Sequence, residues 1–600
     1  MYLVTSAQMR AIEAAADARG NSYADMMQRA GRAVAAATER LIADEVDRSS
    51  AALDHNVQHA LPQGIQHALQ HGVQIVVLVG PGNNGGDGLV AAEALAVAGH
   101  SAQVILWQRE PSEAMARALG ERQVGVPILQ VGVASGLAIL AAWLDQADVV
   151  IDALLGTGAN RPVEGMLAAI LDTVKAACAG RGNKRPKIVA VDLPTGLNAD
   201  SGAIDPHAVP ADLTVTFGCP KVGHFTLPGA SFVGRLEVDT IGIDPTPAEL
   251  NTAAEIAPLP TVTTTSEIAS RPDLTTTEAP IVPIPTVAKV ATVATAAEIA
   301  ATLPARPLGA HKGTFGRALI VAGSVNYVGA AYLAASAAYR AGCGLVTVAV
   351  VKSIQAIIAT LVPEATFEIL PEEAGVVSAA AVKQVVDLWD HVDAVLIGPG
   401  LTSRPPADAF MDELLTALDR RSTAIASPPN APPQLVVDAD GLNLVARFPD
   451  GLARLPAGSV LTPHLGEMAR LSGLAGDELN ADRLGTARRF AGAWGHVVVL
   501  KGAYTVVAAP DGHTSVNPFA NPALATAGTG DVLAGIITGL MAQGMAPFEA
   551  ARAGAFVHAQ AGELAAAPTG GRGVMARDVL GAVGRAMAEI AAGLRAPGDE

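Results

Sequence analysis

A glycine-rich turn that carries side-chain amides and a carboxylate is the first feature of this sequence with clear chemical potential. It runs Gly80-Pro-Gly-Asn-Asn-Gly-Gly-Asp-Gly88 directly after the apolar run Ile75 to Val79, and its first, third and sixth residues form the pattern GxGxxG. Such glycines let the backbone approach a pyrophosphate at the start of a helix, which we expect near Leu89. The next apolar run ends in Trp107-Gln-Arg-Glu110, so the acidic residue that normally holds a ribose is displaced. A standard dinucleotide site is therefore only weakly indicated.

The polar side chains inside this turn suggest a different use. Asn83, Asn84 and Asp87 supply amide and carboxylate oxygens, which suit a monovalent cation and the polar edges of a ligand. Asp152 and Asp192 each end a later apolar run. The carboxyl ends of strands in an open α/β sheet converge on one crevice, so we expect these groups to share a site. One such aspartate more often caps a helix, but three in one domain favour a site.

A further glycine-flanked carboxylate lies near the C-terminus, in Gly528-Thr-Gly-Asp531, before a helical pattern. Glycines at a helix start expose backbone N–H groups and the positive end of the helix dipole to an anion. Asp531 would lie in the first turn, within reach of a reacting hydroxyl. Taken alone, the motif fits equally well a tight turn whose carboxylate satisfies the dipole. No GxxxxGK[ST] sequence occurs, so a Walker-type phosphate loop is excluded.

These motifs need sheets and helices to position them, and the apolar pattern predicts two sets. Short Val- and Ile-rich runs alternate with Ala-rich helical stretches, which is typical of parallel sheets covered on both faces. We therefore expect an α/β domain over residues 1–245, a Thr-, Ala- and Pro-rich linker over 246–305, and a second α/β domain over 306–600. The predicted strands are 75–79, 102–106, 149–151, 187–191 and 212–217 in the first domain, and 318–321, 345–350, 394–397, 435–437, 459–461 and 497–500 in the second.

Residues 45–72 interrupt the first domain with a repeated polar pattern. Asp54-His-Asn-Val-Gln-His-Ala-Leu is echoed by Ile65-Gln-His-Ala-Leu. The histidines could bind a metal, but a short duplicated polar insert is the favoured interpretation.

Composition argues against several classes of function. The 600 residues include 40 Lys and Arg against 57 Asp and Glu, a formal charge of −17, which disfavours binding to nucleic acid. The three cysteines lie far apart without a CxxC pair, which fits a reducing cytosol and argues against a zinc site. Arg10 and Glu13 precede any apolar region, and the uncharged stretch Gln123 to Leu144 is interpreted as a core strand and helix. We therefore expect a cytoplasmic protein with neither a secretory signal nor a membrane span.

The first domain resembles the NAD(P)H-hydrate epimerases, which implies a Rossmann-like, doubly wound sheet. The resemblance rests on GPGNNGGDG, IDALLGTGANRP, VDLPTGLNADSG and ADLTVTFGCPKVGH, and it covers most of residues 1–245. It implies that the hydrated cofactor is bound by Asn83, Asn84, Gly85, Gly86, Asp87, Gly156, Thr157, Gly158, Ala159, Asn160, Arg161, Pro162 and Asp192. It also implies that potassium is bound by Asn84, Asp152 and Thr195, the last of which stands where serine is commoner.

The second domain resembles the ADP/ATP-dependent NAD(P)H-hydrate dehydratases, a ribokinase-like group, over nearly all of residues 306–591. The resemblance rests on GTGD together with HKGTFGRALIVAGS, VLIGPGL, VVDADGLN, LTPHLGEM and VVLKGAYTVV. It implies that Asp531 is the catalytic base and that Glu467 helps to hold Mg²⁺, while His464 could instead simply cap a turn. The implied hydrate-binding residues are Ala330, Gly400, His464 and Asp531. The implied residues for ADP or ATP are Lys501, Gly502, Ala503, Tyr504, Thr505 and Gly530.

Together, the two resemblances imply an enzyme that repairs hydrated NADH or NADPH. The first domain would interconvert the R and S hydrates with the help of Asp192, and the second would dehydrate the S form at the expense of ADP or ATP. The alternative is a ribokinase-type kinase of a small molecule, fused to a Rossmann-like binding scaffold without activity. Release of inorganic phosphate without a phosphorylated product would separate these two functions. The sequence leaves the oligomeric state open, with a homo-oligomer among the options.

Overall fold

The chain folds into two compact units, one of residues 2–261 and one of residues 262–600 together with Met1. The computed structural model describes residues 1–51, 72–110, 126–131, 134–158, 161–246, 249–250, 290–424 and 433–593. Within these ranges, no helix has the length and apolar character needed to cross a membrane.

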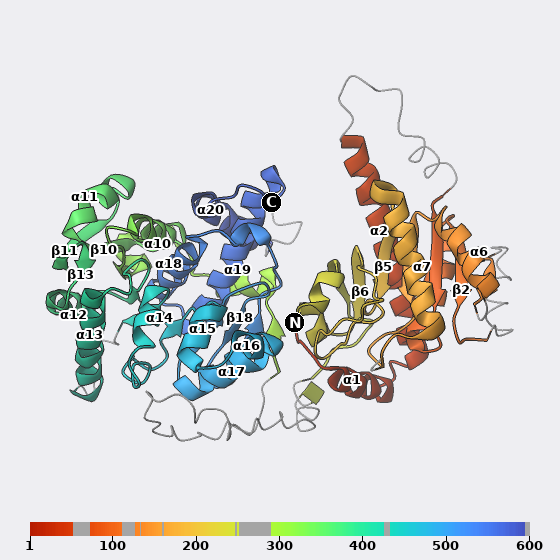
Figure 1. Ribbon diagram of the computed structural model, residues 1–600, viewed down its shortest axis with the longest axis horizontal. Coiled ribbons are helices and arrows are strands. Elements are labelled where there is room, and N and C mark those ends of the chain that lie inside the picture. The colour runs from red at the N-terminus through yellow and green to blue at the C-terminus, as the bar shows by residue number, and fades with distance from the viewer. Residues whose placement is uncertain are drawn as a thin grey trace. The chain divides into compact units, whose positions relative to one another are not determined.

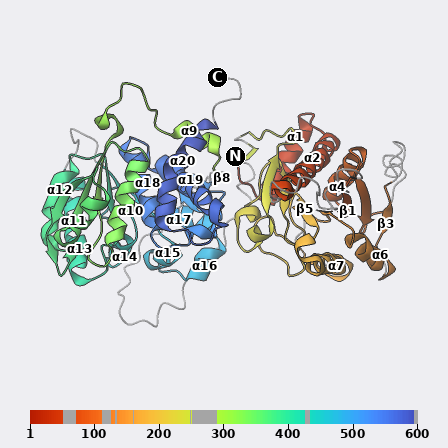
Figure 2. The same ribbon diagram turned by 90° about the horizontal axis from the view of Figure 1, so that it is seen from above.

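The described part of the N-terminal unit is built on a seven-stranded sheet in which all neighbouring strands are parallel. The strands are β1 (Gln74–Val79), β2 (Ser101–Leu106), β3 (Ile128–Gln130), β4 (Val149–Ala153), β5 (Lys187–Val191), β6 (Leu213–Phe217) and β7 (Arg235–Asp239). The main helices are α1 (Ser6–Ala18), α2 (Tyr23–Ala51), α4 (Asn83–Val97), α6 (Ala134–Leu144) and α7 (Gly165–Arg181). Helices α2 and α4 cover one face of the sheet, and α6 and α7 cover the other (Figures 1 and 2). Because both faces are covered, β1 and β4 are buried along nearly their whole length.

The strand order of this sheet is β3-β2-β1-β4-β5-β6-β7, so the chain reverses its direction of travel between β1 and β4. In open α/β sheets, ligands bind at this switch point, beyond the carboxyl ends of the strands. The two strand ends come very close together, because a Cβ atom added to Gly80 would lie 1.8 Å from the carbonyl oxygen of Leu154. Glycine is therefore required where the loop from β1 to α4 begins.

The C-terminal unit contains, within its described residues, a sheet of ten strands. They are β8 (Thr292–Val293), β9 (Arg317–Val321), β10 (Leu345–Val351), β11 (Thr366–Leu370), β14 (Ala394–Ile397), β15 (Gln434–Val437), β16 (Val460–Leu461), β17 (Val497–Leu500), β18 (Val506–Ala508) and β19 (Thr514–Val516). Their order is β11-β10-β9-β14-β15-β16-β17-β18-β19-β8, and all pairs are parallel except β17 with β18 and β18 with β19. A small antiparallel pair, β12 (Glu372–Glu373) and β13 (Val376–Val377), lies apart from this sheet.

Two layers of helices enclose the large sheet (Figure 2). One layer contains α10 (Val328–Arg340), α18 (Thr529–Ala542), α19 (Pro547–Ala566) and α20 (Ala576–Ala592). The other contains α13 (Pro405–Ala424), α14 (Asp440–Val445), α15 (Leu465–Ser472), α16 (Gly476–Ala481) and α17 (Arg483–Trp494). The remaining α-helices among the described residues of this unit are α9 (Ala296–Thr302), α11 (Lys352–Leu361) and α12 (Val382–Trp389).

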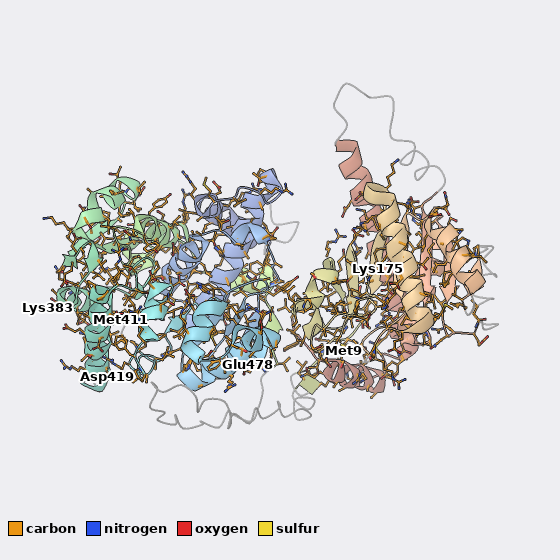
Figure 3. The ribbon with its side chains drawn as sticks, viewed as in Figure 1. Met9, Lys175, Lys383, Met411, Asp419 and Glu478 are labelled. Carbon is orange, nitrogen blue, oxygen red and sulfur yellow. The ribbon has the colours of Figure 1, made fainter. Side chains whose placement is uncertain are left out.

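Aliphatic and sulfur-containing side chains fill the interiors of both units. Met9 of α1 and Met411 of α13 are buried in their respective cores, whereas Lys383 and Asp419 are exposed on the surface of the C-terminal unit (Figure 3). The structure confirms the predicted fold class of two α/β domains, the first of them doubly wound.

The boundary predicted for the C-terminal end of the linker 246–305 is wrong, because residues 290–305 contain β8 and α9. β8 pairs with β19, and Ile299 of α9 is fully buried. The described part of the second unit therefore begins near residue 290 and not at 306. The sequence did not predict this start, because a two-residue strand and a short helix give no clear hydrophobic periodicity in a Thr- and Ala-rich segment. Most of the remaining linker, residues 251–289, lies outside the described residues.

Helix α2 continues to Ala51 and so includes the first residues of the predicted insert 45–72. The rest of the insert, residues 52–71, lies outside the described residues, as do its repeated histidines.

Candidate active sites

The first site begins at the N-terminus of α4, which starts at Asn83 and not near Leu89 as the sequence suggested. Gly82 is the N-cap residue and no side chain caps the helix, so its first backbone N–H groups are available to a ligand. Glycine is also required at position 85, because a Cβ atom added to Gly85 would lie 2.1 Å from the carbonyl oxygen of Gly80. The polar motif is thus the tightly packed first turn of a helix.

The predicted potassium ligands Asp152 and Thr195 contact each other. The Thr195 hydroxyl donates to Asp152 Oδ1 at 2.7 Å, and the Thr195 backbone N–H donates to Oδ2 at 2.8 Å. Burial raises the pKa of Asp152, and these hydrogen bonds oppose the rise. The third predicted ligand, Asn84, packs against Gly156, and its buried Nδ2 has no hydrogen-bond partner among the described residues. A flip of this amide would place oxygen there, so the residues can offer the oxygen ligands that an alkali cation requires.

Asp192 is buried at the end of β5 with a φ of +66°, which is rare for a residue other than glycine. Lys221 Nζ donates to Asp192 Oδ1 at 2.5 Å, and the Thr216 hydroxyl donates to the same oxygen at 2.9 Å. The ammonium also donates to Thr216 Oγ1 at 2.8 Å and to the carbonyl oxygen of Phe217 at 3.1 Å. Burial alone would raise the pKa of Asp192, but the neighbouring Lys221 ammonium keeps it below its ordinary value. Asp192 is therefore ionised at neutral pH.

His224 contacts the backbone of Asp192. Its Nε2 lies 2.9 Å from the Asp192 carbonyl oxygen, and its Nδ1 accepts a hydrogen bond from the Lys221 backbone N–H at 3.1 Å. Burial, with the positive charge of Lys221, lowers the pKa of His224 to about 4. The ring is therefore neutral and donates through Nε2, which helps to hold the strained backbone of Asp192 in place.

The surroundings of Asp87 raise its pKa, whereas those of Asp192 lower the pKa of that residue. Burial, followed by the negative charges of Asp192 and Glu13, raises the pKa of Asp87 to about 8, so this carboxyl is mostly protonated at pH 7. The pKa of Glu13, on α1, is raised mainly by burial as well. Two carboxyls whose pKa values are moved apart are the usual arrangement of an acid and a base within one site. Arg109 braces this region by donating 3.0 Å hydrogen bonds to two carbonyl oxygens of the loop before α4.

The structure describes part of the loop of residues 156–162, which is predicted to contact the ligand. Gly156 lies against Asn84, since a Cβ atom added to Gly156 would be 3.2 Å from Asn84 Cγ. The described residues that follow, which are half-buried or exposed, are Thr157, Gly158, Arg161 and Pro162. Ala159 and Asn160 lie outside the described residues.

The second site is at the start of α18, where the GTGD motif lies as predicted. Gly528 is the N-cap residue with a φ of +91°, and no side chain caps the helix. Its first N–H groups are therefore available to an anion. Burial, and then the negative charge of Asp438, raises the pKa of Asp531 to about 7. A carboxyl with this pKa is suited to accept a proton near neutral pH.

Lys501 lies just after β17, beside the start of α18, and its ammonium group contacts Asp438, which lies just after β15. Its Nζ donates to Asp438 Oδ1 at 2.7 Å, an oxygen that also accepts from Thr462 Oγ1 at 2.7 Å. The same Nζ lies 3.7 Å from Glu467 Oε2 and 3.5 Å from the position of a Cβ atom added to Gly530. Burial would lower the pKa of Lys501, but the negative charges of Asp438 and Glu467 raise it above its ordinary value. An ammonium ion is therefore held next to the GTGD turn.

His464 and Glu467 form the capping box of α15. Nδ1 of His464 accepts from the backbone N–H of Gly466 at 3.0 Å, and Glu467 Oε2 accepts from the backbone N–H of His464 at 2.8 Å. His464 does cap a helix, yet 54% of its side chain is exposed, so its contact with a ligand stays a prediction. Partial burial, with the positive charges of Lys501 and Arg470, lowers the pKa of His464 and keeps the ring neutral.

The predicted magnesium residue, Glu467, has one oxygen engaged in this capping box. Within the described ranges, no group of three or more His, Cys, Asp and Glu side chains could by itself hold a metal ion. Mg²⁺ typically keeps several waters and is bound by one or two carboxylates together with nucleotide phosphates. Glu467 therefore fits as a partial ligand whose site is completed by the nucleotide.

Ala330 and Gly400, both predicted to contact the hydrate, lie side by side. A Cβ atom added to Gly400 would lie 2.9 Å from Ala330 Cβ and 2.7 Å from Tyr327 Cβ. Gly400 has a φ of +67°, and its carbonyl oxygen accepts a 2.8 Å hydrogen bond from Ser324 Oγ. Tyr327 is exposed beside both residues at the start of α10, a placement that the sequence did not predict.

The predicted nucleotide-binding residues 501–505 form the turn between β17 and β18. Thr505 Oγ1 donates to the Gly502 carbonyl oxygen at 2.9 Å, which closes the turn. Arg483 of α17 donates to the carbonyl oxygens of Leu500 and Lys501 at 3.0 Å and 3.2 Å. Arg483 therefore fixes the start of this turn, a role that sequence reasoning missed.

Comparison with known proteins assigns both units. A family model described as "NAD(P)H-hydrate dehydratase" matches residues 318–583, and one described as "YjeF-related protein N-terminus" matches residues 23–223. The bifunctional NAD(P)H-hydrate repair enzyme Nnr of Moorella thermoacetica is 38% identical over 510 residues, which cover 84% of this chain and 86% of that protein. The chain belongs to the family of bifunctional NAD(P)H-hydrate repair enzymes. The member from Thermofilum pendens is 36% identical over 508 residues, 83% of this chain and 84% of that protein.

A solved structure is also similar to part of this repair enzyme. It is the ADP/ATP-dependent NAD(P)H-hydrate dehydratase from Bacillus subtilis, co-crystallised with ATP and Mg²⁺. It is 30% identical, covers 50% of this chain and 99% of its own, and has a TM-score of 0.42.

Sequence reasoning missed several polar residues of the epimerase-like site. Lys221, Thr216 and His224 all lie within ADLTVTFGCPKVGH, one of the motifs on which the resemblance rested. A lysine four residues after the end of a predicted strand was the available signal for Lys221. Glu13 had no such signal, because α1 brings it to the site from a distant part of the sequence.

Proposed function

We propose that this repair enzyme acts on NADH and NADPH that have been hydrated on the nicotinamide ring. The N-terminal unit interconverts the R and S hydrates, and the C-terminal unit dehydrates the S form at the expense of ADP or ATP. The observation that carries the proposal is that one chain of this family holds two separate polar sites, one in each unit. The first pairs an ionised with a protonated carboxyl, and the second sets Asp531 and Lys501 at an uncapped helix start.

Dehydration starts from the hydroxyl that water left on the ring, which is a poor leaving group as hydroxide. Asp531 accepts the hydroxyl proton while the oxygen attacks the terminal phosphorus of the nucleotide, whose P–O bond breaks. The free N–H groups of α18 and the Lys501 ammonium stabilise the charge on the transferred group. The ring nitrogen then donates its electron pair, the C–O bond breaks and phosphate leaves. Loss of a proton from the adjacent ring carbon restores the double bond of NAD(P)H.

Mg²⁺ and the nucleotide complete this second site. Glu467 would help to hold the ion, and the residues for the nucleotide are Lys501, Gly502, Ala503, Tyr504, Thr505 and Gly530. When bound, the ion neutralises charge on the nucleotide phosphates. Ala330, Gly400 and His464 would hold the hydrate so that its hydroxyl faces Asp531.

Epimerisation uses the site at the switch point of the first sheet. Asp192, or a water bound to it, accepts the proton of the ring hydroxyl as the adjacent ring C–N bond breaks, a C=O bond forms and the nitrogen takes up a proton. On closure the nitrogen adds to the other face of the C=O group, and both proton transfers are reversed. Asp87 supports this role because, being protonated, it can donate a hydrogen bond to the oxygen that becomes negative. Potassium, held by Asn84, Asp152 and Thr195, would fix the position of α4 relative to β4 and so orient the ligand at the NNGGD turn.

The function is tested by incubating the purified chain with a mixture of hydrate epimers and either ADP or ATP. Absorbance at 340 nm reports restored NAD(P)H, and chromatography reports the epimer ratio. We expect full restoration from both epimers, with one inorganic phosphate released per NAD(P)H. A stable phosphorylated product with no gain in absorbance would support the kinase alternative instead.

Several further features remain predictions. The partners are hydrated NADH or NADPH and an adenine nucleotide, with no nucleic acid and no membrane. The location is cytoplasmic, and a homo-oligomer stays open. Gel filtration with light scattering of the full chain would determine the oligomeric state.

A further inference from the structure

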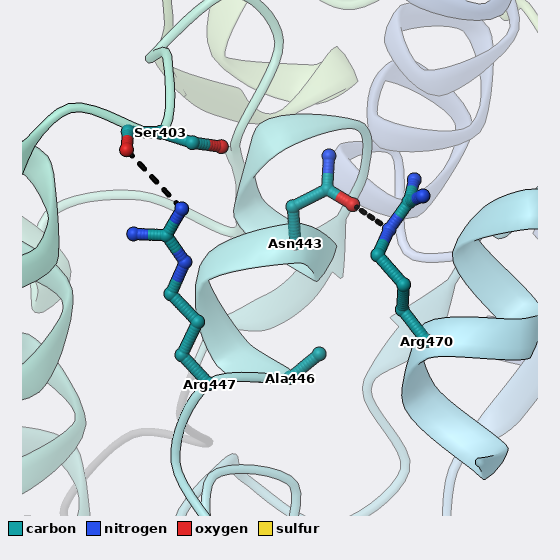
Figure 4. Close-up of a pocket in the computed structure, with 5 residues that line it drawn as sticks. All are labelled: Ser403, Asn443, Ala446, Arg447 and Arg470. Carbon is teal, nitrogen blue, oxygen red and sulfur yellow. Dashed lines mark hydrogen bonds between the residues drawn. The ribbon is translucent and has the colours of Figure 1, made fainter.

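The C-terminal unit has a cavity of about 520 Å³ that none of the roles above uses. It is lined by Ser403, Asn443, Ala446, Arg447 and Arg470 (Figure 4). The lining residues come from α14 and the turn after it, from α15, and from the loop that follows β14.

Hydrogen-bond donors converge on this cavity. Arg470 Nε donates to Asn443 Oδ1 at 2.7 Å, which fixes both side chains and turns the Asn443 amide NH₂ away from this bond (Figure 4). Among the described residues, no acceptor and no carboxylate pairs with the two terminal nitrogens of Arg470. On the opposite wall, Arg447 is held by an ion pair with Asp408 and a 3.2 Å hydrogen bond to the carbonyl oxygen of Ser403. The cavity therefore presents two guanidinium groups and one amide donor, with one nearby carboxylate to offset them.

The cavity adjoins the dehydratase site through α15. A Cβ atom added to Gly466 would lie 3.0 Å from His464 Cε1 and 3.9 Å from Arg470 Nη1. The imidazole and the guanidinium therefore flank the same point on the first turn of α15. A ligand whose reacting end contacts His464 can extend from there to Arg470.

We propose that this cavity binds a phosphate group of the hydrated dinucleotide, with Arg470 as its main donor. The assignment rests on the proposed function, because a dinucleotide carries a pyrophosphate, and NADPH carries a further phosphate on a ribose. A guanidinium has paired N–H donors in a plane that match two oxygens of a phosphate. The volume is within the range of small-molecule sites and exceeds what a phosphate alone needs, so part of a ribose fits as well.

The test compares Arg470→Gln and Arg470→Lys with wild type in the full chain, at saturating ADP and Mg²⁺. The KM for dehydration is measured separately with the S hydrates of NADH and of NADPH. The matched control is Arg585→Gln, which changes an exposed arginine of α20 that pairs with Glu589. For Arg470→Gln we expect KM to rise about 10- to 100-fold with little change in kcat, because a charged hydrogen bond is lost. Arg470→Lys keeps the charge without the paired donors, so an intermediate KM is expected.

The two substrates identify which phosphate is bound. An equal rise in KM for both hydrates assigns the pyrophosphate, and a rise confined to NADPH hydrate assigns the ribose phosphate. An unchanged KM for both hydrates overturns the proposal. If the wild-type chain dehydrates neither hydrate, the proposed function fails instead, and this outcome is distinct from a variant effect.

Discussion

Lys221 Nζ and Asp192 Oδ1 lie 2.5 Å apart, and the two side chains are only 1% and 11% exposed. The pair is thus an ion pair withdrawn from water, at the end of a strand beside the switch point. Removal of one partner from such a pair leaves an uncompensated charge and typically costs about 3–5 kcal/mol. In an epimerase site, the same contact keeps a carboxylate ionised where burial alone would protonate it.

Replacing Lys221 with Met should therefore raise the pKa of Asp192 and slow epimerisation by at least about 100-fold at neutral pH. Because the base then ionises only at higher pH, the acidic limb of the rate profile should move upward. The measurement is the rate of epimer interconversion from about pH 5 to 9. Lys184→Met, at an exposed position, is the matched control. An unchanged rate and pH profile in Lys221→Met would remove this pair from the mechanism.

Asp152→Asn should impair epimerisation and leave dehydration of the S hydrate intact, because it removes a charged cation ligand from the N-terminal unit alone. The Thr195 contacts depend on both carboxylate oxygens, at 2.7 Å and 2.8 Å, so the loop after β5 should also loosen. Higher potassium should restore part of the epimerisation rate. Potassium titrations of both activities check this, with sodium as the control ion. Normal epimerisation by the variant at low potassium would contradict the cation assignment.

Splitting the chain should separate the two activities. A fragment of residues 290–600 should dehydrate the S hydrate, whereas a fragment of 306–600 should be less stable, because it lacks the buried Val293 and Ile299. Each buried aliphatic side chain contributes about 1.5–3 kcal/mol, so the difference in unfolding free energy should be several kcal/mol. Urea unfolding of the two fragments measures it. Equal stability would show that β8 and α9 do not belong to the fold of this unit.

The sequence was sufficient for the fold class because buried parallel strands form apolar runs that alternate with helices. It was insufficient where packing overrides local preference. The six residues from Asn83 to Gly88 include three glycines, which disfavour helix, yet they form the start of α4. Gly85 and Gly86 are required there because an added Cβ atom would clash with Gly80 and Met27. The β8 strand is two residues long and is stabilised by β19, more than 200 residues away in the sequence. Its pairing could not be inferred from local pattern.

The candidate sites follow the same rule. Glycine-flanked carboxylates such as Asp531 have local signatures, and so they could be predicted. The environment that sets their pKa could not, because it depends on partners from other strands. Asp438 holds Lys501 in place through a hydrogen bond, and its effect on the pKa of Asp531 became evident only in the structure.

Dehydration should fall as the pH drops through about 7, because only the ionised form of Asp531 accepts a proton and its pKa is about 7. The raised pKa of Asp531 has the opposite effect on stability, which decreases as the pH rises. The pKa of Asp531 is about 7 in the folded state and 3.8 in the unfolded chain, so the folded state binds the proton more tightly. Protonation of Asp531 therefore stabilises the fold fully below pH 3.8, and this contribution to the free energy of unfolding is lost as the pH rises to about 7. Relative to Asp531→Asn, the wild type should lose on the order of 1 kcal/mol or more over this interval. Thermal unfolding of both proteins across the interval provides the measurement, and parallel curves would contradict the raised pKa.

Asp531→Asn tests the base directly, because the amide keeps the shape of the helix start but cannot accept the hydroxyl proton. Loss of a general base typically slows a reaction by about 10²–10⁴-fold, and we expect the larger end, since the lost charge also changes the surroundings of Mg²⁺. Nucleotide affinity should change little, because the turn of residues 501–505 and the N–H groups of α18 remain. Epimerisation in the other unit should be unaffected, which provides an internal control in the same sample. If the variant restored NADH at nearly the wild-type rate, Asp531 would be no more than a first-turn carboxylate that stabilises the dipole of α18.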